Sequence, residues 1–460
     1  MSEAHTPRSA WRRAVLRSAL RRRQARNYLQ SKFTWNRLYR VTSYLKSALW
    51  TVPIVAIALV FAAAPILRWI DTRLSWELTA LAPSGAQGLY QTVITLTLSF
   101  VVFTFGSLLV AIQVAGGQLT PRIIATLLLR NNVVRYSVGL FVFTLVFAVM
   151  ALNRIDVSVA QLVALLTAIL GIACIANFLF LIDYAARLLR PVSVVASLGN
   201  DGELVVMAVY PEPTVYAAEE AAVLLAEMGR PARTVVYEAR AGIVLAIDLT
   251  TVVALARRHG GVIELIPQVG DFVAADEPLF ALYGGAAAVN DRTLLATVAF
   301  GPERTLEQDP MFAFRILVDI ALKALSPAIN DPTTAVLALD QVHRLLRLVG
   351  KRRLRGDVIT DEAGAPRVIY RTPNWEDYVH VACTEIRACG ATSMQIMRRM
   401  RAMLSDLARS LPEHRHACLV RELSLLDRSI DASFALAEDR DLARIPDVQG
   451  LGGASAARHI

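Results

Sequence analysis

Residues 89–112 have the sequence LYQTVITLTLSFVVFTFGSLLVAI and contain no Asp, Glu, Lys or Arg. A helix needs about 20 predominantly apolar residues to cross the hydrocarbon core of a bilayer. This stretch exceeds that length, and no charged group would have to enter the lipid. It predicts a transmembrane helix and, with it, an integral membrane protein.

Three further uncharged stretches are of suitable length, at residues 47–67, 136–153 and 157–182. The first is a poor signal peptide, because a basic segment of 46 residues precedes it and three more hydrophobic stretches follow. We therefore predict a domain of four transmembrane helices at residues 47–190.

The positive charge of the chain is concentrated before the first hydrophobic stretch. The whole chain has 48 Lys and Arg against 39 Asp and Glu, whereas residues 1–46 hold twelve basic residues and one acid, Glu3. A hydrophobic content of 55% with 19% charged residues excludes a disordered chain. We interpret residues 1–46 as a basic N-terminal arm that is attracted to anionic lipid, and we expect no nucleic acid partner.

The charges of the loops predict the orientation in the membrane. The loop after the second hydrophobic stretch carries Arg122, Arg130 and Arg135 and no acid, whereas the loops on the other side are nearly neutral. By the positive-inside rule, both termini then lie in the cytoplasm, and the protein crosses the membrane several times. Apolar residues at helical spacing also predict a short amphipathic helix at about residues 119–131, on the inner membrane face.

The soluble half begins with β-rich sequence. Short apolar runs punctuated by glycines predict a cytoplasmic β-rich module at residues 198–286, with a helix near 217–228 and strands at 203–209, 234–237, 242–247, 262–265 and 278–282. Residues 261–280, GVIELIPQVGDFVAADEPLF, resemble half of a lipoyl- or biotinyl-type sandwich barrel with a turn at Gly270-Asp271. No Lys lies at a hairpin tip where such a group would be attached. We therefore expect a sandwich-barrel-like module for binding or assembly.

The rest of the chain predicts a cytoplasmic helical module at residues 290–440 with a hairpin at 358–370, followed by a flexible tail at 441–460. Helices are expected at about 312–325, 334–349, 374–411 and 412–438. The predicted fold class is thus an α-helical integral membrane domain followed by a cytoplasmic α+β region.

A charged motif opens the helical module and comprises Arg304, Asp309, Arg315, Asp319, Asn330, Asp331 and Thr333. In one interpretation, these side chains form buried ion pairs and helix caps that hold the helices together. In the other they form a ligand or ion site, in which the aspartates bind a divalent cation or the arginines bind an anion. The sequence leaves both interpretations open.

Part of this motif also resembles a known family. The run ALKALSPAINDPTTA at residues 321–335 is similar to the signature of a bacterial family of predicted membrane proteins, domain of unknown function 2254. Gly106-Ser107 and Leu119-Thr120-Pro121-Arg122 match the membrane part of that family. The resemblance covers about residues 38–436. It implies the organisation described above and a location in the inner membrane of a bacterium, but it implies no established activity.

Motifs for common enzymatic chemistry are absent from the sequence, namely a GxxxxGK[ST] phosphate loop, a GxGxxG turn, an HExxH helix, a CxxC pair and a GxSxG elbow. His414 and His416 could bind a metal with Glu413 and Cys418, but side chains two positions apart on a helix point away from each other. Four cysteines are too few and too poorly spaced for a disulfide framework. We predict no catalytic residue, no metal site, no cofactor and no enzymatic activity.

The second hydrophobic stretch carries the clearest functional signal, because small and hydroxyl-bearing residues recur along one side of the predicted helix, at Thr92, Thr95, Ser99, Gly106 and Gln113. Such residues are common where membrane helices pack closely. They also line pathways through channels. Both interpretations imply that this helix contacts something other than lipid.

Two functions fit these features. The first is a homo-oligomeric channel or transporter with a cytoplasmic regulatory domain, because four helices are too few to enclose a pathway within one subunit. The second is a membrane scaffold or sensor that transports nothing and binds a cytoplasmic partner or a small ligand. The oligomeric state and a flux measurement would separate the two.

Overall fold

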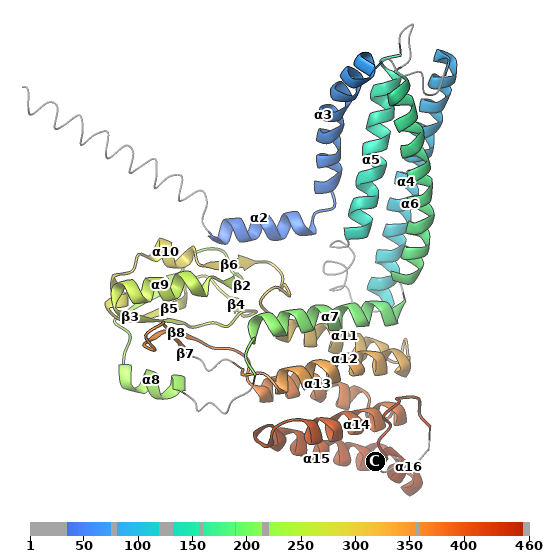
Figure 1. The fold of residues 1–460 in the computed structure, drawn as a ribbon. Helices are drawn as coiled ribbons and strands as arrows, with labels where there is room; N and C mark the ends of the chain where they lie inside the picture. Colours follow the sequence, from blue (N-terminus) through green and yellow to red (C-terminus); the bar gives the residue numbers. More distant parts are fainter. Residues whose placement is uncertain are drawn as a thin grey trace, which may run out of the picture. The chain divides into compact units, whose positions relative to one another are not determined.

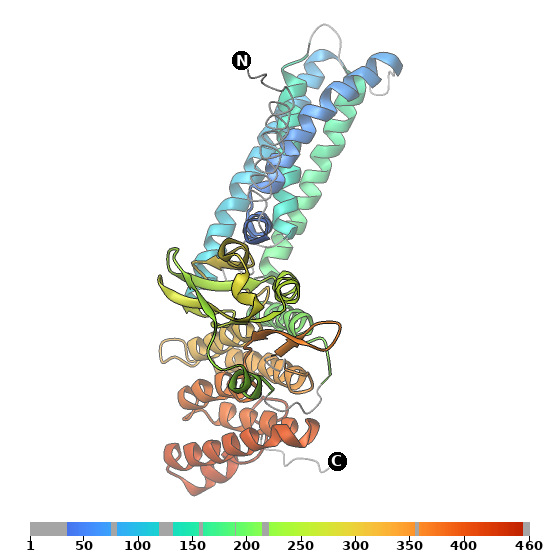
Figure 2. The same cartoon turned by 90° about the vertical axis from the view of Figure 1, so that its left-hand side faces the viewer.

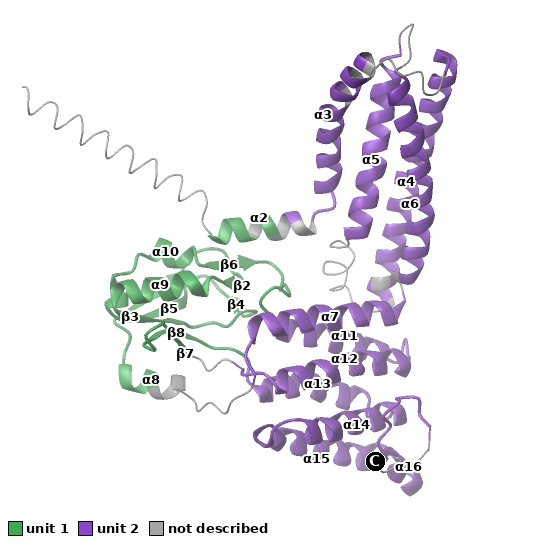
Figure 3. Cartoon of the chain, viewed as in Figure 1, with its two compact units in different colours: residues 1–44, 217–309, 355–372 green, residues 45–216, 310–354, 373–460 purple. Residues whose placement is uncertain are grey.

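The computed structural model describes residues 35–74, 81–118, 132–155, 160–188, 190–213, 220–354 and 358–453. The chain divides into two compact units, which Figure 3 colours separately. Unit 1 comprises residues 1–44, 217–309 and 355–372, and unit 2 comprises residues 45–216, 310–354 and 373–460. The amphipathic helix predicted at 119–131 and most of the N-terminal arm lie outside the described residues.

Unit 2 contains a bundle of four long helices, α3 (Thr51–Leu74), α4 (Pro83–Gln118), α5 (Asn132–Leu152) and α6 (Gln161–Leu188). They run side by side in two perpendicular views (Figure 1, Figure 2). Among the described residues, α4, α5 and α6 are long and apolar enough to cross a membrane, and α3 contains a shorter apolar stretch at Thr51–Leu67. The described part of each hydrophobic stretch predicted from the sequence therefore lies mostly on a helix of this bundle.

The centre of the bundle is α5, which packs against α3, α4 and α6. Its Phe141 is fully buried. Glycines let the helices approach closely: a Cβ on Gly139 would lie 2.5 Å from Val52, and a Cβ on Gly171 would lie 2.9 Å from Val93. Small residues at helix crossings are typical of membrane bundles. Side chains thus fill the middle of the single-chain bundle.

The helix α7 (Pro191–Val209) follows the bundle and begins with a proline, whose missing N–H costs no hydrogen bond at that position. By length and apolarity alone it is a further candidate for crossing a membrane. Its buried face, however, packs against α11 (Pro310–Ala324) and α12 (Pro332–Gly350). A Cβ on Gly199 would lie only 2.1 Å from Oε1 of Gln341 in α12. We therefore assign α7 to the helical module.

The strand predicted at residues 203–209 is wrong, because these residues form the last turns of α7. The run Leu204-Val205-Val206 has a high β propensity. Buried positions nevertheless recur at the helical period, at Val195, Leu198, Gly202 and Val206. Packing of this face on α11 and α12 outweighs the local preference for a strand.

The helical module consists of α7, α11 and α12 together with α13 (Trp375–Cys389), α14 (Met394–Ser410), α15 (His416–Ser433) and α16 (Ala437–Ala443). The single helix predicted at 374–411 is divided at Gly390. The helix predicted at 412–438 begins only after a 3-10 turn at Glu413–Arg415 and ends at Ser433. Within this module α11 is buried along almost its whole length.

The end of the described chain differs from the flexible tail predicted at 441–460. Arg398 is 1% exposed and donates hydrogen bonds to the carbonyl oxygens of Ile445 at 3.0 Å and Gly453 at 2.7 Å. The carboxylate of Asp447 accepts hydrogen bonds from three backbone N–H groups, those of Gln449, Gly450 and Gly452. These contacts fix the segment between α16 and residue 453, and residues 454–460 lie outside the described part of the chain.

Unit 1 contains two β-sheets, a five-stranded one in the order β1-β5-β3-β8-β7 and a three-stranded one in the order β4-β2-β6. The strands are β1 (Arg233–Tyr237), β2 (Gly242–Ile247), β3 (Gly261–Leu265), β4 (Phe272–Val273), β5 (Glu277–Gly284), β6 (Val298–Gly301), β7 (Val358–Thr360) and β8 (Pro366–Tyr370). The strands predicted at 234–237, 242–247, 262–265 and 278–282 are confirmed. The described strands do not close into a barrel, so the sandwich-barrel topology is not confirmed.

The predicted hairpin at 358–370 is present as β7 and β8, but β8 pairs in parallel with β3. The hairpin therefore completes the sheet of unit 1 and does not belong to the helical module. Unit 1 also contains the helices α2 (Trp35–Ser47, up to Tyr44), α8 (Glu220–Met228), α9 (Leu249–His259) and α10 (Asp291–Leu295) and the 3-10 turn η2 (Gly285–Ala288). Its core is formed by inward side chains of the large sheet and of α9, including Ile263, Phe280 and Val252.

Candidate functional site

The residues singled out on α4 all lie on one exposed side of that helix: Thr92, Thr95, Ser99, Gly106 and Gln113. Val102, on the same line, is 65% exposed. Two other hydroxyl residues of α4, Thr97 and Thr104, are buried against the bundle. The hydroxyl groups of α4 thus divide between a buried face inside the single-chain bundle and an exposed face.

The hydroxyl groups on the exposed side bind the backbone of their own helix. Thr92 Oγ1 donates to the carbonyl oxygen of Gly88 at 2.8 Å, and Thr95 Oγ1 donates to that of Gln91 at 2.9 Å. Ser99 Oγ donates to the carbonyl oxygen of Thr95 at 2.8 Å. Because each donor already has an acceptor, these side chains can lie in an apolar environment without leaving a proton unbonded.

Three glycines extend the same side of α4 over its whole length. A Cβ on Gly88, Gly106 or Gly117 would meet no atom within 4 Å. This differs from Gly139 and Gly171 in α5 and α6, which neighbouring side chains cover closely. We define the α4 stripe as the exposed row Gly88, Thr92, Thr95, Ser99, Gly106, Gln113 and Gly117. Gly88 and Gly117 were not singled out from the sequence, although their spacing continues the row.

The charged motif separates into several local interactions. Arg304 and Asp309 belong to unit 1 and form an ion pair in which Arg304 Nε lies 2.8 Å from Asp309 Oδ2. The Asp309 side chain is only 3% exposed. The pair lies directly against Gly270, where a Cβ would be 2.1 Å from Arg304 Nη2. It therefore holds the predicted turn at Gly270, whose φ is +96°.

Arg315 and Asp319 belong to unit 2 and lie one turn apart on α11. Arg315 Nε donates to Asp319 Oδ1 at 2.7 Å, and its Nη1 and Nη2 bind both carboxylate oxygens of Glu385 on α13. The hydrogen bonds to Glu385, and to a lesser extent those to Asp319, raise the pKa of Arg315. Arg315 in turn lowers the pKa of Glu385. Sequence reasoning missed Glu385, because it lies 70 residues away along the chain.

The turn between α11 and α12 is an N-cap. Asp331 Oδ1 accepts a hydrogen bond from the backbone N–H of Thr334 at 3.0 Å, and Asp331 Oδ2 accepts one from its hydroxyl at 2.5 Å. Asn330 has a positive φ of 47°, a conformation that Asn tolerates better than most residues. Thr333 is exposed. Asp331 thus stabilises the start of α12.

These contacts favour the structural interpretation of the charged motif. Asp309, Asp319 and Asp331 each bind a protein group, an arginine in two cases and the backbone of α12 in the third. In the part of the chain that the structure describes, no three His, Cys, Asp or Glu side chains are grouped as metal ligands would be. The Arg304–Asp309 pair holds the turn at Gly270, Arg315 joins α11 to α13, and Asp331 caps the start of α12.

His343 on α12 has partners that the sequence did not reveal. Its Nδ1 lies 3.2 Å from Arg399 Nη2 and its Nε2 lies 3.0 Å from Asp406 Oδ2, both on α14. An arginine can only donate, so Nδ1 accepts and Nε2 carries the proton. Burial and the nearby Arg399 lower the pKa of His343. The histidine therefore joins α12 to α14 in its neutral form.

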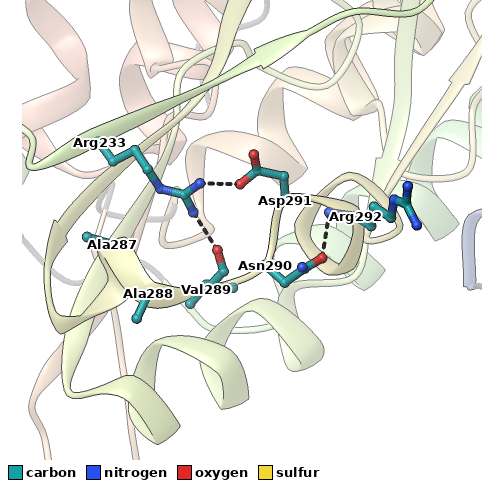
Figure 4. Close-up of a pocket in the computed structure, with 7 residues that line it drawn as sticks. All are labelled: Arg233, Ala287, Ala288, Val289, Asn290, Asp291 and Arg292. Atoms are coloured by element: carbon teal, nitrogen blue, oxygen red, sulfur yellow. Dashed lines mark hydrogen bonds and ion pairs between the residues drawn. The ribbon is translucent and has the colours of Figure 1, made fainter. Parts of the chain in front are cut away.

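A shallow, open depression of about 500 Å³ lies on the surface of unit 1 (Figure 4). It is lined by Arg233, Ala287, Ala288, Val289, Asn290, Asp291 and Arg292. The guanidinium group of Arg233 binds the carboxylate of Asp291 and the carbonyl oxygen of Val289. Because an internal carboxylate already neutralises this arginine, the depression is a weak candidate for an anion site, and the α4 stripe is the stronger functional candidate.

Comparison with known proteins agrees with this membrane architecture. The profile of the family described as "Predicted membrane protein (DUF2254)" matches residues 46–406. The chain belongs to this family. The DUF2254 match includes the whole helical bundle, all of unit 1 from α8 onward and the helical module as far as α14.

The chain is also similar to proteins of two mycobacteria. It is 25% identical over 455 residues to an uncharacterized protein of Mycobacterium bovis and to one of Mycobacterium tuberculosis. Each alignment covers 92% of this chain and 83% of the relative. No solved structure matches the chain. These comparisons extend the family's membrane organisation to this chain without assigning it an activity.

Proposed function

We propose that this DUF2254 protein is a homo-oligomeric channel or transporter of the bacterial inner membrane. In this proposal the α4 stripes of several copies line a shared axis, and the cytoplasmic modules regulate passage. The observation that carries the proposal is the exposed row of glycine and hydroxyl residues along α4. Glycine lowers the stability of a helix, whereas it favours association where a second membrane helix packs against it.

A ring of copies is the arrangement that this surface favours. Every copy presents the same stripe, and copies related by rotation about one axis form a closed assembly. Within the described part of the bundle, α5 fills the centre with side chains such as the fully buried Phe141, which disfavours a route through a single copy. A pathway for a solute would therefore lie between copies.

The chemistry of the stripe predicts the character of such a pathway. It offers hydroxyl oxygens, glycine backbone and the amide of Gln113, but no fixed charge. Such a lining would discriminate only weakly between cations and anions. The exposed Val102 and Val110 lie on the same line. They could close a narrow pathway by excluding water.

Disulfide cross-linking tests whether the stripes of two copies meet. A background that lacks the accessible thiols, Cys389→Ser with Cys418→Ser, receives either Ser99→Cys on α4 or Ile172→Cys on α6. Both positions are exposed, and Ile172 is 68% exposed. We expect covalent dimers in membranes from the Ser99→Cys protein and none from the Ile172→Cys protein, because a disulfide requires Cβ atoms about 4 Å apart. Equal cross-linking at both positions would contradict the arrangement.

Glycine substitutions provide an independent test of assembly. Gly106→Leu adds a side chain where the folded chain has open space, so each copy should fold normally while the oligomer dissociates. Gly171→Leu is the matched control, because its side chain would collide with Val93 inside the bundle and should lower the stability of each copy. The mass of the protein in nanodiscs and its thermal unfolding distinguish the two effects.

Flux through liposomes tests transport itself. Liposomes loaded with KCl should lose K⁺ and Cl⁻ faster when they contain the protein, and Ser99→Asp should shift the preference towards K⁺. A second function remains if assembly is found without flux. The hydroxyl donors of the stripe are already bound to their own backbone, which suits dry helix packing. A cross-linked oligomer that passes neither ion would therefore be a membrane scaffold or sensor.

A further inference from the structure

The helix α2 (Trp35–Ser47) has one face attached to the three-stranded sheet of unit 1 and to residues beside it. The backbone N–H of Asn36 donates to the carbonyl oxygen of Ala296 at 3.2 Å, and Tyr39 Oη donates to Glu307 Oε2 at 3.0 Å. The rings of Trp35 and Tyr39 stack with centroids 5.2 Å apart and pack against the buried Ala246 and its neighbours on β2 and β6. This face of α2 therefore has a protein partner.

The other face of α2 carries a row of exposed apolar side chains. Leu38 and Val41 are each 53% exposed, and Leu45 is 40% exposed. Their spacing of three and four residues places them on one line of the helix, away from Trp35 and Tyr39. Arg37 lies beside this row and is also exposed. We call Leu38, Val41 and Leu45 the α2 ridge.

The position of α2 in the chain indicates what covers the ridge. The helix ends at Ser47, and α3, the first helix of the membrane bundle, begins at Thr51. Three residues separate them, so the end of α2 lies close to the point where the chain enters the bilayer. The last of these three is Trp50, which is 48% exposed, and tryptophan prefers the membrane–water boundary.

The charge of the sequence around α2 indicates which kind of membrane surface is favoured. Residues 1–46 hold twelve basic residues and one acid. Basic residues next to an apolar helix face attract anionic phospholipid headgroups. An amphipathic helix of this kind inserts its apolar side chains at the boundary between headgroups and acyl chains.

We propose that α2 is an interfacial helix with two partners. Its ridge inserts into an anionic bilayer surface, while Trp35, Asn36 and Tyr39 hold the three-stranded sheet of unit 1 and the residues beside it. The helix is then a direct mechanical link between the lipid surface and the cytoplasmic β-sheets. This proposal depends only on the protein being in a membrane, and it stands whether or not α4 lines a pathway.

Fluorescence of the full-length protein tests this link. In the Cys389→Ser, Cys418→Ser background, Leu38→Cys, Val41→Cys and Leu45→Cys proteins are each labelled with the environment-sensitive dye NBD and reconstituted into equimolar phosphatidylglycerol and phosphatidylcholine. Val448→Cys and Phe272→Cys are matched controls, because both residues are apolar and are 78% and 66% exposed. We expect blue-shifted emission and quenching by doxyl-labelled lipid at the three ridge positions, and neither at the controls.

Three results would overturn the proposal. The first is that NBD at Leu38→Cys and Val41→Cys emits at the same wavelength as NBD at the water-exposed control Val448→Cys. The second is a blue shift without quenching by doxyl lipid, which would mean that protein covers the ridge. The third concerns the charge of the lipid. We expect quenching to weaken in phosphatidylcholine alone, and also to weaken in the Arg37→Gln protein. Quenching that stays the same after both changes would refute the preference for anionic lipid.

Discussion

Gly270 lies where both its backbone angle and its surroundings require glycine. Its φ is +96°, and a Cβ would lie 2.1 Å from Arg304 Nη2. Gly270→Ala should therefore lower the stability by about 1–3 kcal/mol from backbone strain, with a further loss from displacement of the ion pair. Gly364→Ala is the control, because Gly364 has a φ of +78° but open space around it. Thermal unfolding in detergent should rank Gly270→Ala as clearly the more harmful of the two.

The arginines of the charged motif should differ in importance according to the burial of their partners. Arg304→Ala removes the guanidinium group that binds Asp309, which is 3% exposed. We expect this to lower the free energy of unfolding by roughly 3–5 kcal/mol. Arg315→Ala removes the guanidinium group that binds Asp319 and Glu385, which are 18% and 52% exposed. We expect a smaller loss in the free energy of unfolding, roughly 1.5–3 kcal/mol. Arg257→Ala breaks a surface pair with Glu362 and should cost about 0–1 kcal/mol. Chemical denaturation of the three variants would refute this ranking if Arg257→Ala proved the most harmful.

His343 predicts a pH dependence of stability. Burial and Arg399 lower its pKa in the folded protein below the ordinary value of 6.5. Below pH 6.5 the unfolded chain therefore binds a proton that the folded protein resists, so stability falls as the pH drops from 6.5 towards the folded pKa, and is unaffected by this group above 6.5.

His343→Gln should reduce the fall of stability that we expect as the pH drops below 6.5. His380→Gln is the matched control, because it removes an exposed histidine from the same helical module. Apparent unfolding temperatures from about pH 5 to about pH 8 measure the effect. If the His343→Gln protein loses as much stability below pH 6.5 as the unaltered protein, other groups cause the loss.

At the scale of single residues, the sequence predicted interactions that are local. Arg315 and Asp319 are one helical turn apart, and Asp331 stands three residues before the N–H that it caps, so both contacts follow from spacing. Glu385, Arg399 and Asp406 could not be assigned as partners, because each comes from a helix distant in the chain. The tertiary packing of helices decides such contacts, and spacing does not encode it.

At the scale of elements, apolar length and period predicted most helices and strands, and the errors have physical causes. The valines at the end of α7 favour a strand locally, but Gly199 and Gly202 let α7 pack closely against α12, and this packing favours the helix. Gly390 is the C-cap of α13 and divides what one apolar period suggested was a single helix, and Ile396 of α14 packs so closely that a Cβ there would lie 2.5 Å from it. Both errors lie at glycines where another part of the chain packs closely.

At the scale of the whole molecule, the alternation of basic and neutral loops predicts the orientation, and Cys389 offers a direct test. This thiol is exposed at the end of α13, whereas Cys174 and Cys383 are buried. In a Cys418→Ser background, a membrane-impermeant maleimide should label Cys389 in inverted membrane vesicles and leave it unlabelled in intact spheroplasts. Cys389→Ser is the negative control. Labelling of intact spheroplasts would place the helical module outside the cell and reverse the orientation.

The place of β8 in the sheet has a consequence for the synthesis of the protein. Ile263 of β3 pairs with Val368 of β8, and α11 and α12 are encoded between them. A ribosome adding roughly 5–20 residues per second needs about 5–20 s to advance from one partner to the other. During that time one edge of β3 lacks its native neighbour, and such an edge can pair with a wrong strand. Slow translation of this stretch would lengthen the exposure, so the nascent chain should depend most on chaperones while α11 and α12 are being made.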